Sequence, residues 1–258
     1  MKPADFTWIV PNTRWFGKRY WNHIPYVEGL LTAVLRRDGF SVNVVDANDE
    51  NLSQDDLLAR LTDLAPNMVG VSCMSVEYKQ TSHACFEIAK SISPEIITIM
   101  GGVYPSISKD IAFEDENIDY LVVGEGEERL PNLIRAINSS SGFQNVDGIM
   151  YREDGKVIEN PQNSVGIENL DTLPYPDYSD YDMHKLMNWG EKYTQNFQFR
   201  QFPVGIIMTS RGCPYRCTYC AAGKDLNPIN DRKNVRGRSP EHVLGEIDYM
   251  RENYGMRE

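Results

Sequence analysis

An α/β fold built on a parallel sheet is predicted by two observations on this 258-residue sequence. Over the first 140 residues, short apolar runs alternate with amphipathic helical patterns. This alternation is typical of parallel strands joined by helices that cover the sheet faces. Small or glycine-containing loops follow several of the apolar runs, where an open parallel sheet binds its ligands.

Five strands are expected in this first domain, residues 1–140, at residues 7–10, 41–46, 68–73, 96–100 and 119–123. Five parallel strands are typical of a flavodoxin-like sheet. Between them, apolar residues at helical spacing over 27–35 precede Gly39, which suits a left-handed helix end. Ser53 and Asp56 resemble a capping box, and Pro66 ends the helix that they begin. Further helices are expected over 84–92, 107–113 and 127–137.

Two more regions follow the first domain. Residues 141–203 form a connector, in which apolar segments at 149–152 and 156–159 flank Asp154-Gly155, a hairpin turn signal. Residues 204–258 begin with a strand expected over 204–209. A helix then starts at Ser239-Pro240-Glu241, with serine as N-cap and proline at the first helical position, and ends at Gly255. This third region therefore reads as a single strand-loop-helix unit.

Composition limits the functions open to the chain. The net charge of −11 disfavours a nucleic-acid surface, which needs clustered lysine and arginine. No apolar run approaches the roughly 18–20 residues that span a bilayer, and the N-terminus lacks a signal-peptide core, so we expect a cytoplasmic protein without membrane contact. Cys73 and Cys85 are expected to be buried free thiols. The basic run over 232–238 fits either a solvated loop or a role near an anionic ligand.

Three cysteines carry the most specific chemistry in the sequence. Cys213, Cys217 and Cys220 stand at C-x3-C-x2-C spacing directly after the apolar run 204–208. Three thiolates on one loop can each hold one iron of a [4Fe-4S] cube, which leaves the fourth iron open to a small molecule. A zinc knuckle would need a fourth ligand, and the nearest candidate, His242, lies in an expected helix. Three ordinary buried thiols are the remaining alternative, which the compact spacing disfavours.

The loop Cys213-Pro-Tyr-Arg-Cys-Thr-Tyr-Cys220 resembles the cluster motif of radical S-adenosylmethionine (SAM) enzymes. The resemblance implies a [4Fe-4S] cluster on these cysteines, SAM bound to the open iron, and release of a 5′-deoxyadenosyl radical. It also implies a small-molecule substrate, an electron donor such as flavodoxin or ferredoxin, and Tyr219 beside the SAM adenine. The catalytic domain of this family is a partial (β/α)6 barrel. We therefore expect residues 204–258 to be its first β/α unit in a truncated chain, which alone would release little 5′-deoxyadenosine.

The first domain resembles the cobalamin-binding domain that precedes many radical SAM domains. The resemblance rests on several short motifs in order, among them Val45-Asp46, Gly70-Val-Ser72, Gly101-Gly102 with Pro105, and Gly124-Glu-Gly-Glu127. Small residues after the strands leave room for a large flat ligand. The cofactor-contacting residues are expected to be Ser72, Ser75, Gly101, Gly102, Pro105, Gly124 and Gly126.

One departure from the cobalamin pattern matters. The D-x-H-x-x-G motif, whose histidine ligates cobalt in classical cobalamin domains, is absent; Asp182-Met-His184 lacks the glycine. Many radical SAM relatives also lack that histidine, so cobalamin remains the expected ligand, and a vestigial domain that only packs against the barrel is the alternative. His23, His83 and His184 are expected to be structural or surface residues.

The resemblance implies a cobalamin-dependent radical SAM enzyme, with methyl transfer to an unactivated carbon as the leading reaction. A cobalamin-dependent cyclisation or rearrangement and a non-catalytic cobalamin-binding fragment are the alternatives. A methylthiotransferase acting on transfer RNA is disfavoured, because the first domain offers only two of the three further cysteines that such an enzyme needs.

Overall fold

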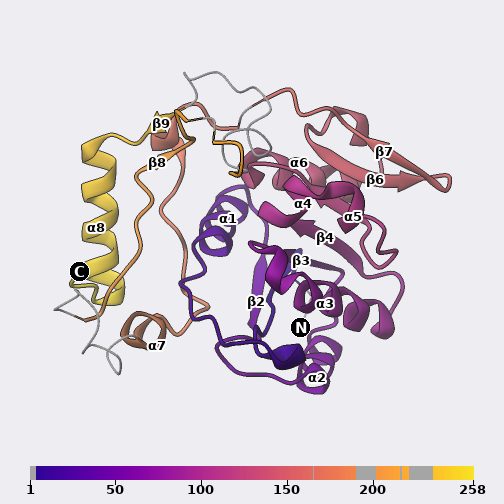
Figure 1. Cartoon of the computed structure of the whole chain (residues 1–258), viewed down its shortest axis with the longest axis horizontal. Helices are drawn as coiled ribbons and strands as arrows, with labels where there is room; N and C mark the ends of the chain where they lie inside the picture. Colours follow the sequence, from indigo (N-terminus) through magenta and orange to yellow (C-terminus); the bar gives the residue numbers. More distant parts are fainter. Residues whose placement is uncertain (1–3, 165, 190–201, 216, 221–234) are drawn as a thin grey trace.

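A seven-stranded sheet forms the centre of the computed structural model, which describes residues 4–164, 166–189, 202–215, 217–220 and 235–258 (Figure 1). The strands are β1 (Phe6–Val10), β2 (Val42–Asp46), β3 (Met68–Ser72), β4 (Ile97–Gly101), β5 (Tyr120–Val122), β6 (Ile149–Glu153) and β7 (Lys156–Glu159). The first five are those expected from the sequence. They are parallel and run in the order β2-β1-β3-β4-β5, which is the flavodoxin-like order.

The hairpin at 149–159 departs from the expected arrangement, because it extends the sheet from five strands to seven. β6 pairs antiparallel with β5, with Leu121 opposite Met150, and β7 continues the sheet outward. Ile149, Met150 and Tyr151 are all buried. Their apolar side chains gain more by covering the β5 edge and its neighbouring helix than they would in an isolated hairpin.

Helices cover both faces of the sheet. α1 (Tyr26–Arg37) and α6 (Gly126–Ser139) pack on one face, where Leu35 and Leu133 join one core cluster. The other face carries α2 (Gln54–Leu64), α3 (Lys79–Ile92), α4 (Val103–Ile107) and α5 (Lys109–Ala112). Short 3-10 turns lie at η1 (Trp15–Gly17), η2 (Val76–Tyr78), η3 (Phe143–Asn145) and η4 (Leu170–Thr172).

The helix ends follow the expected local chemistry. The Ser53 hydroxyl accepts a hydrogen bond from Asp56 N at 3.1 Å, and the Asp56 carboxylate accepts one from Ser53 N at 3.0 Å. This reciprocal pair is the predicted capping box. Gly39 has φ +91, which confirms the left-handed turn expected after α1.

The connector contains α7 (Met183–Asn188), and the third region contains β8 (Ser210–Arg211), β9 (Arg236–Gly237) and α8 (Pro240–Tyr254). Ser239 caps α8 by accepting from His242 N at 3.1 Å, and Gly255 ends the helix at φ +70, as expected. The strand expected over 204–209 is not formed, and only Ser210 and Arg211 pair, with β9. A strand requires a hydrogen-bonded neighbour, and among the described residues only β9 pairs with this segment.

Figure 1 shows the later part of the connector, after the β6–β7 hairpin, and α8 on the α1 side of the sheet, away from α2 and α3. Tyr178 of the connector packs with Met250 of α8 in one buried cluster, and its ring also touches Gly29 of α1 closely. No helix among the described residues has the length and apolar character needed to cross a bilayer.

Candidate functional site

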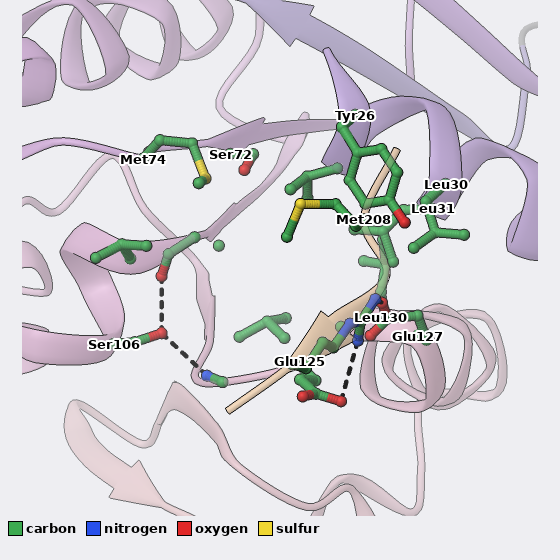
Figure 2. A pocket seen from close by; sticks show the side chains of 18 of the residues that line it. Tyr26, Leu30, Leu31, Ser72, Met74, Ser106, Glu125, Glu127, Leu130 and Met208 are labelled. Atoms are coloured by element: carbon green, nitrogen blue, oxygen red, sulfur yellow. Dashed lines mark hydrogen bonds and ion pairs between the residues drawn. The ribbon is translucent and has the colours of Figure 1, made fainter. Parts of the chain in front are cut away.

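A cavity of about 450 Å³ opens at the carboxyl ends of β3, β4 and β5 (Figure 2). Part of it is an apolar slot between one sheet face and two helices. Trp8, Ile99 and Val122 line the slot from the sheet, and Leu31 and Leu130 line it from α1 and α6. An apolar slot of this kind can accept a flat aromatic group, because its walls are almost wholly hydrocarbon and aromatic surface.

The rim of the cavity is built from glycine loops that the strand ends place together. Gly101 ends β4, and a Cβ there would meet only the Val122 carbonyl oxygen, at 3.8 Å. The Ser106 hydroxyl donates to the Gly102 carbonyl oxygen at 2.7 Å and accepts from Gly124 N at 3.0 Å, which ties the loop after β4 to the loop after β5 (Figure 2). The rim is therefore low in side chains and held at a fixed width.

Three polar atoms of residues that line the cavity lack a hydrogen-bond partner within the described parts of the chain. They are the hydroxyl oxygen of the buried Ser72, the indole nitrogen of the buried Trp8 and Nε of the half-buried Arg236. A buried polar group without a partner costs free energy, so such atoms beside a cavity indicate a ligand that would satisfy them. Tyr26 adds a further polar group, and burial raises the pKa of its phenol, so that the hydroxyl keeps its proton.

The opposite wall comes from the third region of the chain. Met208, Ser210, Arg211 and Gly212 line the cavity there, and Gly212 directly precedes Cys213. The same cavity therefore has the glycine loops of the first domain on one side and the segment that leads into the cysteines on the other.

A buried charge network joins these two walls. The Arg211 guanidinium contacts the Glu127 carboxylate at 2.5 Å and the Glu125 carboxylate at 3.1 Å, while Arg236 also binds Glu125. Burial alone would lower the pKa of Arg211, but the adjacent Glu127 and Glu125 charges outweigh it and hold this pKa above its usual value. The arginine is therefore permanently charged and paired.

The three cysteines are free thiols at the surface end of this wall. Cys213 is half-buried, Cys217 and Cys220 are exposed, and Cys220 N donates to the Cys217 carbonyl oxygen at 3.2 Å. Within the described ranges, no three histidine, cysteine, aspartate or glutamate side chains are close enough together to hold a metal ion. A metal site of this kind is usually assembled by the metal itself, so the ligand role of the three cysteines stays a prediction.

Comparison with known proteins assigns the family. Residues 28–134 match the family model described as the B12 binding domain. The chain is 28% identical over 227 residues to an uncharacterized methyltransferase of Pyrococcus horikoshii, which covers 88% of the chain and 46% of that protein. It is 30% identical over 230 residues to an anaerobic magnesium-protoporphyrin IX monomethyl ester cyclase of Rubrivivax gelatinosus, covering 85% of the chain and 38% of that protein. Residues 28–134 thus match a B12-binding domain, and over most of its length the chain is similar to proteins of the B12-binding radical SAM family.

Solved structures of this family have the same fold. The cobalamin-dependent SAM radical enzyme OxsB superposes with a TM-score of 0.71 at 23% identity, covering 99% of this chain and 33% of that one. The radical SAM methyltransferase TsrM from Kitasatospora setae gives 0.69 at 18% identity, covering 96% and 45%. The chain spans about half the length, or less, of the curated relatives and solved structures that it matches.

The cavity of this B12-binding chain gathers five of the seven residues that the sequence proposed as cobalamin contacts. They are Ser72, Gly101, Gly102, Gly124 and Gly126. Ser75 and Pro105 do not line it: Ser75 caps η2 by accepting from Glu77 N at 3.2 Å, and Pro105 is buried in α4. Tyr219, proposed to lie beside the SAM adenine, is 90% exposed. All of these binding roles stay predictions.

The histidines of the B12-binding domain lie outside the cavity. His83 Nδ1 contacts the Asp115 carboxylate at 2.6 Å, while Asp182 caps α7 by accepting from Lys185 N at 3.0 Å. The described part of the cavity wall contains no histidine. His23, His83 and His184 are therefore not placed to ligate a cobalt ion in this cavity.

Sequence reasoning missed the charge network. The sequence analysis uses the glycines of Gly124-Glu-Gly-Glu127 and assigns no role to its carboxylates. The basic run at 232–238 fits either a solvated loop or a role near an anionic ligand, but Arg236 binds Glu125 and Arg238 binds Glu246 of α8. Acidic residues in a turn beside the cavity and arginines flanking the cysteine loop were a signal, but pairing them required the fold.

Proposed function

We propose that this chain provides the cobalamin site and the cluster loop of a radical SAM enzyme that transfers a methyl group to an unactivated carbon. One observation carries the proposal: a single cavity is bounded by the glycine loops of a B12-binding domain and by the segment that enters the three cysteines. Two cofactors that act on one substrate must face each other across such a space.

The residues present fit cobalamin. Its flat macrocycle needs an open rim with few side chains, which Gly101, Gly102 and Gly124 provide. Its nucleotide tail ends in an aromatic base, which suits the apolar slot between the sheet and α1 with α6. The Ser72 hydroxyl and Trp8 indole nitrogen would then gain the partners that they lack.

The cysteine loop fits a three-ligand cluster. Its three thiols are unoxidised, lie within eight residues and have at least partial access to solvent. Thiolates are the donors that iron–sulfur clusters require. When bound, the cluster with SAM supplies radical chemistry, and cobalamin supplies a transferable methyl group. The chain's own part is to hold both near one cavity, to which Leu31, Leu130 and Met208 contribute apolar side chains.

The names of relatives support methyl transfer. Besides the Pyrococcus protein, the chain is 26% identical over 270 residues to the cytidylyl-2-hydroxyethylphosphonate methyltransferase of Streptomyces wedmorensis, covering 89% of the chain and 49% of that protein. A second candidate is radical cyclisation, which the 30% identity to the Rubrivivax cyclase favours. In either case we propose that the substrate is a small molecule and that a flavodoxin or ferredoxin donates the electron.

The proposed location is a reducing cytoplasm. Cys73 and Cys85 are buried free thiols, as expected from the sequence, and the surface cysteines are also unpaired. The net charge of −11 favours neither nucleic acid nor an anionic membrane as a partner.

Anaerobic reconstitution tests the proposal. The chain is purified without oxygen, supplied with iron and sulfide, mixed with hydroxocobalamin and desalted. We expect about four irons per chain and a cobalamin spectrum that survives desalting. A chain that retains neither would contradict the proposal. Retention of the radioactive SAM methyl group in the protein–cobalamin fraction would favour methyl transfer over cyclisation.

A further inference from the structure

We propose that Glu125 is a positioning residue that fixes the cysteine loop against the B12-binding domain. It acts through Arg211 and Arg236, with Glu127 as a second anchor; we call these four side chains the clamp. The contacts between these four side chains are sufficient to support the clamp. That the clamp also sets the distance between cobalamin and the cluster rests on the proposed function.

The clamp offsets a charge repulsion within the β8–β9 pair. Arg211 and Arg236 lie directly opposite each other in this antiparallel pair. Like charges at opposed positions share one sheet face and destabilise strand pairing. Glu125 relieves the repulsion, since one carboxylate oxygen binds Arg236 Nη2 and the other lies 3.1 Å from Nη1 atoms of both Arg211 and Arg236. Pairing of β8 with β9 therefore depends on a carboxylate from another region of the chain.

Burial makes the clamp strong enough to hold the strands. Arg211 and Glu127 are only 17% and 7% exposed, and their atoms approach to 2.5 Å. A buried charge that loses its partner is far more costly than a surface charge in the same situation. The Arg236 guanidinium also donates to the Ile167 carbonyl oxygen, so the connector is held at the same point.

The position of the clamp links it to both cofactor sites. Arg211 and Gly212 lead directly into Cys213, while the turn that carries Glu125 and Glu127 lines the cavity. Figure 2 shows the two glutamates together at one edge of the cavity, across from Ser72 and Met74. A ligand that reaches this edge of the cavity thus touches the turn that holds the start of the cysteine loop. Contacts that order this turn would also order the loop, and the effect would be reciprocal.

Hydrogen exchange of the whole 258-residue chain, without added cofactors, tests the clamp. The probes are the backbone amides of residues 209–212 and 236–238, which include Arg238 N, bonded to the Thr209 carbonyl oxygen at 2.9 Å. Glu125→Gln keeps the shape and removes the charge. We expect exchange at these amides to become at least about tenfold faster, with the β1 and β3 amides unchanged. Glu125→Gln/Arg236→Gln removes the opposed charge as well, so its exchange should be slower than in Glu125→Gln alone.

Asp38→Asn is the matched control. Asp38 also bridges two arginines, Arg37 and Arg135, but within the first domain. The Asp38→Asn substitution should leave the exchange rates of the β8 and β9 amides unchanged. Unchanged exchange in Glu125→Gln, or equal acceleration in the double variant, would overturn the clamp. Loss of β1 and β3 protection in Glu125→Gln would also overturn it, because the residue would then support the domain as a whole.

The clamp and the proposed function fail separately. Hydroxocobalamin binding is measured on the unsubstituted chain from the same preparation. Absence of binding with the expected exchange pattern would contradict the cofactor assignment and leave the clamp supported.

Discussion

The backbone of Gly102 packs directly on the backbone of Cys73. A Cβ atom on Gly102 would lie 2.6 Å from the Cys73 carbonyl oxygen and 2.8 Å from its amide nitrogen. The same carbonyl oxygen accepts from Tyr104 N at 2.9 Å, which starts α4 beside the end of β3. The close approach of two strand ends at the cavity rim therefore requires a glycine at position 102.

Gly102→Ala should destabilise the fold. The new methyl group would clash with backbone, and φ +100 is strained for any residue with a Cβ. We expect the free energy of unfolding, measured with urea, to fall by at least about 2 kcal/mol. Gly101→Ala is the control, since its Cβ meets only one atom, at 3.8 Å. It should lose less stability while weakening cobalamin binding, and an equal loss in both variants would contradict this account.

Ser72→Ala should separate ligand binding from folding. The Ser72 hydroxyl has no partner within the described residues, so its removal should change the free energy of unfolding by less than about 1 kcal/mol. If the hydroxyl bonds cobalamin, the dissociation constant measured by spectral titration should rise about five- to tenfold. Thr7→Val removes another unpartnered buried hydroxyl, one that does not line the cavity. Identical affinities in the two variants would exclude this role for Ser72.

Cys213→Ala should abolish cluster assembly. With two thiolates left, iron after anaerobic reconstitution should fall from about four per chain to below about one. Cys85→Ala is the control, because Cys85 is buried in the domain core and burial raises its pKa well above that of an ordinary thiol. The measurements are the iron content per chain and the visible absorption band of the iron–sulfur cluster. Full iron in the Cys213 variant, or zinc in place of iron, would remove the basis for radical chemistry.

Asp46 should make stability fall with rising pH. Burial, aided by the nearby Asp49 and Glu28 charges, raises the pKa of Asp46 from 3.8 to about 6, although hydrogen bonding from Asp49 N and the charge of His23 act against it. Between about pH 4 and pH 6 the folded chain keeps a proton that the unfolded chain has released. Its contribution to the free energy of unfolding therefore decreases as pH rises through this window.

Asp46→Asn should remove that dependence. Its side-chain oxygen can still accept from Asn48 N and Asp49 N, which Asp46 does at 3.1 and 2.8 Å. The stability advantage of the variant should grow from pH 4 to pH 6 and reach up to about 3 kcal/mol at pH 7. Asp154→Asn, at the exposed hairpin turn, should show no comparable trend. A constant difference across the pH range would show that Asp46 is not protonated in the fold.

Local signals in the sequence predicted much of the fold. Ser53 with Asp56, Gly39, and Ser239 with Gly255 begin or end helices where expected, because capping depends on residues within a few positions. The five parallel strands were also expected. The pairing of the hairpin strand β6 with β5 was not expected, because period-two apolar patterning identifies a strand but not the sheet edge on which it pairs.

The location of the cavity was predictable from the sequence, but only some of the residues expected to line it do so. Glycine and serine after strand ends predicted where the cavity opens, because parallel strands bring their carboxyl ends to one edge. Ser75 satisfies its own turn and Pro105 is enclosed by α4, and neither fact is visible from spacing. The pairing of Arg211 with Glu127 joins positions 84 residues apart, and no local pattern encodes it.

The β6–β7 hairpin has a consequence for how the molecule meets its neighbours. An uncovered β5 would present its unpaired peptide groups beside the cavity, where strands of other chains could add to the sheet. With the hairpin in place, the outermost strand is the four-residue β7, which begins and ends with the charged, exposed Lys156 and Glu159. So short a strand, with a charge at each end, is a poor template for intermolecular strand addition, which disfavours self-association at this edge of the sheet.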